Sequence, residues 1–466
     1  MCHLGASRWG MALVSIGLAG CGGTNTTADG VGADTTAERP EQPVPGAGGG
    51  PNAGVGDGGD GPTEPTEPVP WQPWAHAVGA DVYAVATDSA GNVVIATWAP
   101  PAGGMSTRIA ADLTVRKLDP LGVELWSTSY SGECSSPLDL VVTPDDQIWL
   151  ACRSGDQLYL ETTLGPTGEI ETYAFAHLVH LSKDGIVSHE DWWTTALDAG
   201  ANPLLAMSAD GELFTSDSDG VFALRAADGT EQWRVPAPVD GLIVADLAVA
   251  ADGDVLVTGS FTGAVGFDGG ALGADLATGT KLFVARYDGA GQLLWTEAWP
   301  LATSPRIAPA PDGGFVLCGQ FETPFELGEQ RLDPGGTREA FLAGFDAAGA
   351  VRFSRSFPVF CTGLDVTSDG TIAMIAGLPD VVDLGAGEIG SPDNLSVLYA
   401  QFASDGSLIG NAAFLGTDAT FGRAIAIHPH GGALLVGAAT GTIDFGFEQL
   451  VSAPGFVARL ELPVPK

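Results

Sequence analysis

Histidines are the side chains of this sequence that most readily bind metal ions, and their spacing does not predict a metal site. His177 and His180 are three residues apart in a segment with strand character, which points them to opposite faces of the strand. His428 and His430 share a face but flank Pro429 in a turn, where solvated turn residues are the simpler interpretation. The Cys and His spacing of a zinc site does not occur. We therefore predict no metal-ligating residue.

Calcium and cofactor chemistry have only weak support. Asp217 and Asp219 precede Gly220 as in half of a calcium loop, but the other spaced acids and the distal Glu are missing. A structural Ca²⁺ among the many Asp-Gly turns is compatible with the sequence, and no other cofactor is identified. The chain has no Gly-x-Ser-x-Gly elbow, no phosphate loop and no dinucleotide-binding fingerprint. We predict no catalytic residue from motifs.

Cysteines offer redox chemistry. Four of them lie beyond the N-terminal segment, namely Cys134, Cys152, Cys318 and Cys361. An even set in an exported chain predicts disulfides. Three pairings are open, and Cys134–Cys152 with Cys318–Cys361 needs the shortest spans. Free buried thiols are the alternative.

Two kinds of turn alternate along the chain and define the elements that carry these residues. The first-type turns are 90–92, 145–147, 210–212, 252–254, 312–314, 369–371 and 430–432. The second-type turns begin at Asp119, Asp184, Asp228, Asp288, Asp346 and Asp405. Asp-Gly turns between short runs of β-branched and aromatic residues indicate hairpins.

This alternation predicts an all-β protein, a seven-bladed β-propeller over residues 71–466. The last repeat lacks an outer strand and the N-terminal end has one to spare, so we expect an N-terminal strand to close the last blade. A pair of stacked β-sandwiches, the alternative, would not explain that match. An aromatic residue recurs on the expected outer strands, and we predict that these side chains pack neighbouring blades together: Trp71, Trp126, Trp192, Trp233, Trp295 and Phe353.

The N-terminus predicts export. Residues 1–20 combine Arg8 with a short apolar core, as in a signal peptide, and Leu18-Ala19-Gly20-Cys21 resembles the lipobox of bacterial lipoproteins. The resemblance implies that Cys21 is acylated and becomes the first residue of the mature chain. Gly22 in place of Asp favours the outer membrane, on its periplasmic side or at the cell surface. An ordinary secretory signal is the alternative.

Residues 21–70 are predicted to form an acidic, disordered linker. Gly and Pro make up 21 of the 49 residues 22–70, so this segment cannot bury enough apolar surface to fold. The whole chain has 57 acidic residues against 19 Lys and Arg. Such a surface excludes nucleic acid as a partner and leaves the lipid anchor as the contact with the membrane. We expect the propeller to be a monomer.

Two family resemblances follow from the repeats. With Phe283-Val-Ala-Arg286 before a second-type turn and Trp295 after it, the units resemble SBBP-type bacterial β-propeller repeats of myxobacterial-type lipoproteins. That resemblance implies fold and compartment. Asp228 to Trp233 and Asp288 to Trp295 also resemble the tryptophan-docking repeats of pyrroloquinoline-quinone dehydrogenases, which implies packing by Trp, because the cofactor residues are not recognisable.

These features predict a lipid-anchored envelope propeller that is a non-catalytic binding or interaction scaffold, with an envelope protein or a glycan as its partner. We expect binding on the face that carries the cysteines and the long segments between second and third strands. The alternatives are a structural surface protein and a hydrolase or lyase with its active site at the central channel. Propellers assemble active sites from residues scattered over several blades, so the missing motif does not exclude an enzyme.

Overall fold

The computed structural model describes residues 72–99, 112–130, 136–153, 163–164, 170–171, 173–196, 203–216, 222–225, 230–235, 242–267, 270–272, 279–300, 302–335, 338–451 and 454–461. The chain divides between Val69 and Pro70, and all of these residues belong to the second part. They form strands and turns. No helix among them is long and apolar enough to cross a lipid bilayer. The predicted signal peptide, Cys21 and the linker lie outside the described residues.

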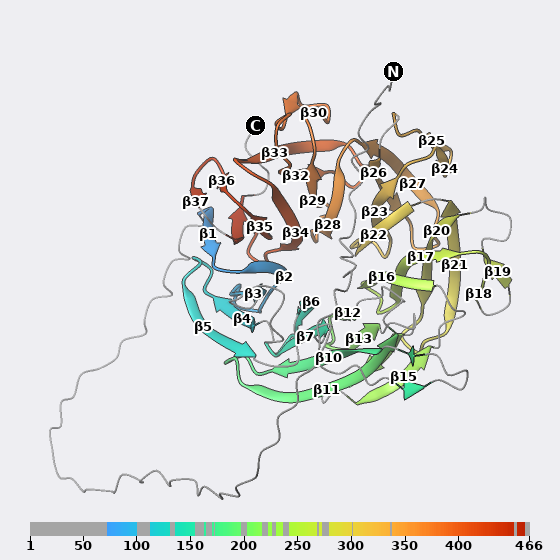
Figure 1. Ribbon diagram of the computed structural model, residues 1–466. Coiled ribbons are helices and arrows are strands. Elements are labelled where there is room, and N and C mark those ends of the chain that lie inside the picture. Colours follow the sequence, from blue (N-terminus) through green and yellow to red (C-terminus); the bar gives the residue numbers. More distant parts are fainter. Residues whose placement is uncertain are drawn as a thin grey trace, which may run out of the picture. The chain divides into compact units, whose positions relative to one another are not determined.

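Seven antiparallel sheets, numbered 1 to 7 here, follow one another along the chain, in the arrangement of a β-propeller (Figure 1). Sheet 1 contains β2 (Asp81–Thr87), β3 (Val93–Ala99), β4 (Asp112–Leu118) and β5 (Glu124–Tyr130). Sheet 2 contains β6 (Ser136–Val142), β7 (Ile148–Arg153), β10 (Tyr173–Leu181) and β11 (Val187–Ala196). Sheet 3 contains β12 (Leu204–Met207), β13 (Leu213–Ser216), β14 (Phe222–Arg225) and β15 (Glu231–Val235). Sheet 4 contains β16 (Leu242–Val249), β17 (Val255–Thr262), β20 (Thr280–Tyr287) and β21 (Leu293–Pro300).

The remaining sheets repeat this order. Sheet 5 contains β22 (Ala302–Pro309), β23 (Phe315–Phe321), β26 (Glu339–Phe345) and β27 (Val351–Phe357). Sheet 6 contains β28 (Phe360–Val366), β29 (Ile372–Leu378), β32 (Ser396–Phe402) and β33 (Leu408–Gly416), and the short strands β36 (Thr442–Asp444) and β37 (Gln449–Val451) extend it beyond β33. Sheet 7 contains β34 (Thr420–Ile427), β35 (Ala433–Ala439), β38 (Gly455–Leu460) and β1 (Trp74–Val78). In each sheet the first strand lies nearest the centre of the ring (Figure 1).

Strand β1 comes from the N-terminal end and pairs antiparallel with β38, from Trp74 opposite Arg459 to Val78 opposite Gly455. An N-terminal strand thus completes the last sheet. It begins at Trp74, and Trp71, the predicted outer-strand aromatic, lies outside the described residues.

The predicted turns hold the strands in register. Asp288 accepts hydrogen bonds on Oδ1 from the backbone N–H groups of Ala290 and Gln292, at 3.0 and 2.8 Å. Gly291 donates its N–H to the Asp288 carbonyl. Its φ of 78° is a left-handed backbone conformation that would be strained for a residue with a side chain. Asp caps the turn and Gly supplies its left-handed residue, which explains why this pair recurs in the sequence.

The long segments between second and third strands form extra hairpins, as the alternating apolar residues predict. The described ones are β8–β9 (Thr163–Leu164, Ile170–Glu171), β18–β19 (Val265–Phe267, Gly270–Leu272), β24–β25 (Phe325–Leu327, Gln330–Leu332), β30–β31 (Val382–Asp383, Glu388–Ile389) and β36–β37 (Thr442–Asp444, Gln449–Val451). Hairpin β24–β25 contacts β21 on one side and β27 on the other. It fills the gap between the outer strands of two sheets.

The core lies between the sheets. Strands β29, β32 and β35 are buried at every position, because a strand inside the ring has neighbouring sheets on both faces. Such strands become continuous apolar runs, as in Ile372-Ala-Met-Ile-Ala-Gly-Leu378.

Candidate functional site

Indole side chains on the outer strands bind the next sheet. Trp126 Nε1 donates to the Lys183 carbonyl at 3.0 Å, and Trp233 and Trp295 donate to the Gly289 and Ala347 carbonyls, each at 3.2 Å. Trp74 does the same in sheet 7, donating to the Pro120 carbonyl at 3.0 Å.

These acceptors all lie in second-type turns. A glycine of the same turn packs against the aromatic ring of the tryptophan. A Cβ at Gly185 would come within 2.7 Å of Trp126, and one at Gly291 within 2.9 Å of Trp233. Phe353 packs in the same way against Gly406, without an N–H to donate. Trp192 lies in β11 opposite His177.

Buried cations reinforce the same contacts. Arg286 in β20 pairs with Asp252 and Asp254 of its own sheet, at 2.6 and 2.7 Å. Its Nη1 donates to the Gly313 and Ala347 carbonyls of sheet 5, at 2.9 and 3.0 Å. The Ala347 carbonyl therefore accepts from both a guanidinium and an indole.

Lys117 and Arg459 occupy the corresponding places in sheets 1 and 7. Lys117 pairs with Asp88 at 2.8 Å and donates to the Lys183 carbonyl at 3.3 Å. Arg459 donates to the Pro120 carbonyl at 2.8 Å. Cations thus join several neighbouring sheets on the face of the ring that carries the turns.

His428 corrects the prediction of a solvated turn residue. Its side chain is buried, and Nε2 lies 2.8 Å from the Gly91 carbonyl of sheet 1. Burial and, less strongly, the neighbouring Arg459 charge lower the pKa of His428 to about 4, against the hydrogen bond to Gly91. The sequence did not reveal this, because Gly91 lies at the other end of the chain.

Two of the predicted cysteines form a disulfide between sheets. Cys318 in β23 and Cys361 in β28 are bonded, with their Cα atoms 6.4 Å apart. Cys152 is also disulfide-bonded, and Cys134 lies outside the described residues. The alternative of free thiols is therefore wrong for the three cysteines that the structure describes.

The centre of the ring contains a cavity of about 220 Å³. Residues from all seven inner strands line it, and the polar ones are Tyr83, Asp139, Asp246, Arg306, Thr362 and Arg423. A β-bulge interrupts the inner strand of six sheets near this level. A bulge turns backbone groups and side chains out of the regular ladder, which here directs them into the channel.

Aspartates of the inner strands connect neighbouring sheets beside the cavity. Asp139 Oδ2 accepts the backbone N–H of Leu205 in sheet 3 at 2.8 Å, and Asp246 Oδ2 accepts that of Ile307 in sheet 5 at 2.9 Å. Asp365 Oδ2 repeats this contact with Ile427 in sheet 7 at 2.7 Å. In each case Oδ1 accepts the N–H of the following residue.

Burial inside the propeller shifts the pKa values of these carboxyl groups. Burial and, less strongly, the charge of Asp246 raise the pKa of Asp139 to about 7, against the backbone hydrogen bonds and Arg306. Burial also raises the pKa of Asp246, which Arg306 opposes, and raises that of Asp365 to about 6. Asp139 is therefore a carboxyl group that can hold or release a proton near neutral pH.

Arg306 spans the channel between three inner strands. Its Nε donates to the Thr362 carbonyl at 3.1 Å, and Nη1 to the Ala245 carbonyl at 3.2 Å. Within the described part of the chain, Nη2 makes no hydrogen bond. Arg423 lies over the Tyr83 ring at 4.8 Å and pairs loosely with Asp81 at 3.4 Å.

The cavity combines a protonatable carboxyl group, carboxylate acceptors, guanidinium donors and an aromatic ring. This set can bind hydroxyl, amide or carboxylate groups of a small ligand. Sequence reasoning missed it, because its residues come one or two at a time from seven strands. A polar residue within an apolar inner strand, such as Asp246 or Arg306, was the available signal.

Metal binding has no candidate among the described residues, which contain no group of three or more His, Cys, Asp or Glu side chains placed to hold an ion. Asp217 and Asp219 lie outside those residues.

No protein-family model matches the chain, and no curated protein matches it. Among solved structures, it is similar to virginiamycin B lyase from Staphylococcus aureus, with 8% identity and a TM-score of 0.46 over 84% of this chain and 99% of that chain. BamB from Moraxella catarrhalis gives 11% and 0.40 over 83% and 84%. Hydrazine synthase from Kuenenia stuttgartiensis gives 10% and 0.46 over 81% and 97%.

Proposed function

We propose that this protein is an exported, lipid-anchored β-propeller of seven blades that serves as a non-catalytic binding module of the cell envelope. The lipobox-like segment ending at Cys21 and the linker to residue 70 support the anchor. The seven sheets, whose inner strands line a common cavity, support the blade number. The acidic surface supports attachment to the membrane through lipid and not through charge.

The observation that carries the binding proposal is the charged lining of the central cavity. A ring that only had to close could fill its centre with apolar side chains, since buried charge is costly unless it is paired. Instead Arg306, Asp139 and Asp246 lie there, and a volume of about 220 Å³ is left beside them. We propose that a polar group of an envelope glycan binds there, with its hydroxyl groups donating to the carboxylates and accepting from the guanidinium groups.

The test is binding of the detergent-solubilised full-length protein to a glycan array and to envelope extract, with and without Ca²⁺. We expect saturable binding that Arg423→Ala weakens at least tenfold. Arg338→Ala is the matched control, because Arg338 is also a partly exposed arginine paired with an acid, Glu322, but lies away from the channel. Equal binding by both variants, or no glycan ligand at all, would refute the channel as the binding site.

A hydrolase or lyase at the same cavity is the second candidate, and the pKa of Asp139 favours it. A carboxyl group with a pKa of about 7 can act as a general acid or base at neutral pH. Turnover of a bound glycan that Asp139→Asn abolishes, while binding persists, would establish the enzyme. Binding without turnover would favour the module.

A further inference from the structure

One position on the third strand differs among the sheets in a way that opens a second cavity. Within each sheet, this third-strand residue lies opposite the second residue of the second strand, as Arg286 lies opposite Leu256 in sheet 4. Lys117, Arg286 and Arg459 hold it in sheets 1, 4 and 7, and Gly344 holds it in sheet 5. His180, Leu224 and Gln401 hold it in sheets 2, 3 and 6. Gly344 therefore stands where three other sheets have a long cation, and it is the one residue in this set that has no side chain.

The missing side chain leaves two backbone acceptors of sheet 6 without a donor. In sheet 5, the Gly313 and Ala347 carbonyls accept from Arg286. The turns place Gly370 and Ser404 at the equivalent positions of sheet 6. Neither of these carbonyls accepts a hydrogen bond from any residue in the described ranges. Phe353, in place of a tryptophan, has no N–H to offer.

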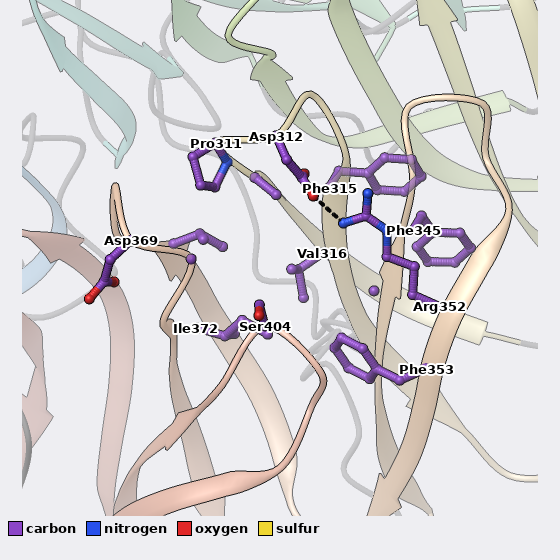
Figure 2. A pocket seen from close by; sticks show the side chains of 14 residues that line it. Pro311, Asp312, Phe315, Val316, Phe345, Arg352, Phe353, Asp369, Ile372 and Ser404 are labelled. Carbon is purple, nitrogen blue, oxygen red and sulfur yellow. Dashed lines mark hydrogen bonds and ion pairs between the residues drawn. The ribbon is translucent and has the colours of Figure 1, made fainter.

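A cavity of about 180 Å³ lies in this place, between sheets 5 and 6 on the face that carries the turns. Phe315, Phe345 and Phe353 form its apolar wall, and Asp312, Arg352 and Ser404 lie around its opening (Figure 2). Asp369 lies at the edge of the lining, with its carboxylate directed outward in this view (Figure 2). The cavity is large enough for one long side chain.

The charges at the opening favour a cation. Arg352 pairs with Asp312, which neutralises both (Figure 2). Asp369 accepts hydrogen bonds from the Thr367 hydroxyl and the Thr371 N–H, which lower its pKa, and it makes no ion pair with a described residue. The lining therefore carries one negative charge without a matching positive charge.

We propose that this cavity binds the side chain of an arginine displayed by another polypeptide. The methylene groups of the guest lie along the phenylalanine rings, and its guanidinium group donates to the Gly370 and Ser404 carbonyls, as Arg286 does one sheet earlier. Arg286 reaches both carbonyls with Nη1 and keeps Nε and Nη2 for carboxylates, a division of donors that the compact ammonium group of lysine makes less well. The partner is thus a basic protein, which the strongly acidic chain would attract. This site is separate from the central channel.

The probe is N-acetyl-arginine methylamide, and saturation-transfer NMR at physiological salt measures its binding to the full-length protein. We expect transfer to the side-chain methylene protons and a dissociation constant in the millimolar range, because one residue makes few contacts. The citrulline analogue is the matched ligand, since it has the same shape without the charge. It should bind at least tenfold more weakly, and the lysine analogue should also bind more weakly than arginine.

Two variants locate the site. Gly344→Arg combined with Phe353→Trp rebuilds the pair of sheet 4, fills the cavity from within and should abolish binding while raising the Tm. The second change is included because a Cβ at Gly344 would collide with the Phe353 ring. Asp369→Asn needs no repacking and should weaken binding severalfold, whereas Asp210→Asn, in the corresponding turn of sheet 3, should not.

Equal binding of the arginine and citrulline analogues would overturn the proposal, as would unchanged binding by Asp369→Asn or by the rebuilt variant. A lysine analogue that binds as tightly as arginine would overturn the assignment to a guanidinium group. Arg423→Ala should leave arginine binding intact, so that failure of the channel proposal and failure of this one remain distinguishable.

Discussion

Single buried cations join neighbouring sheets at the level of the residue. Arg286 contacts two carboxylates of its own sheet and two carbonyls of the next, and its side chain is almost fully buried. The Phe-Val-Ala-Arg pattern of the sequence therefore encodes a run of buried apolar residues that ends in an inter-sheet contact.

We expect Arg286→Ala to destabilise the protein by about 3 kcal/mol, because it leaves the largely buried Asp254 of sheet 4 and the Gly313 carbonyl of sheet 5 without their donor. The shift of the guanidinium chloride midpoint measures this loss. Arg352→Ala removes an exposed ion pair and should cost at most about 1 kcal/mol. Similar midpoints for the two variants would contradict the role given to Arg286.

Asp139 predicts a pH dependence. Its folded pKa of about 7 lies above the value of about 4 in an unfolded chain, so folding favours its protonated form. Its contribution to stability is complete below about pH 4 and is lost as the pH rises to about 7. Asp139→Asn removes this loss, so the Tm of the variant relative to wild type should rise between pH 4 and 7 and then level off. Asp210→Asn, in an exposed turn, should show no such trend in thermal denaturation.

At the level of the element, sheets 5 and 6 are held differently from sheets 4 and 5. Their interface has Gly344 and Phe353 instead of an arginine and a tryptophan, but the Cys318–Cys361 bond joins β23 to β28. The disulfide thus joins sheets 5 and 6, whose interface lacks the arginine and tryptophan hydrogen bonds that join sheets 4 and 5.

Removing this disulfide should lower stability substantially. The bond joins residues 43 positions apart, and the chain-entropy relation gives about 4 kcal/mol for a loop of that length. We expect the double variant Cys318→Ser, Cys361→Ser to unfold at a correspondingly lower guanidinium chloride concentration without reductant. An unchanged midpoint would mean that other contacts hold this interface.

The hairpins between second and third strands are structural elements in this ring. Phe325 and Leu327 of β24 are buried in the same cluster as Trp299 and Phe341, between the outer strands of two sheets. Phe447 and Val451 of the β36–β37 segment are exposed, however, so not every apolar residue of these hairpins is used in packing. Partner binding on the face that carries the hairpins stays a prediction.

For the whole molecule, closure depends on one strand. Strand β1 covers the edge of β38, and Trp74 and Arg459 both donate to the Pro120 carbonyl of sheet 1. The first and the last of the described strands therefore meet sheet 1 at one junction.

A chain that begins at residue 79 lacks β1 and should lose cooperative unfolding and aggregate, because an uncovered strand edge is a template for pairing. A chain that begins at residue 70 keeps β1 and is the control. Light scattering and thermal denaturation compare them. A monomeric, cooperatively unfolding chain without β1 would show that closure does not stabilise the ring.

The sequence by itself determined the described turns, the repeating strand order and the places of Trp126, Trp233, Trp295 and Phe353, because these depend on residues close together in the chain. Asp288 and Gly291 form their turn from local hydrogen bonds and a local φ value. It also predicted Cys318–Cys361 within one of the three possible sets of disulfides. Only the tertiary structure decided the rest. Asp139, Arg306 and Arg423 share one cavity because seven distant strands converge, and His428 is buried because closure brings it to Gly91. The role of Gly344 can be recognised only by comparison with the equivalent residues of the other sheets, because the cavity beside it is lined by both sheet 5 and sheet 6.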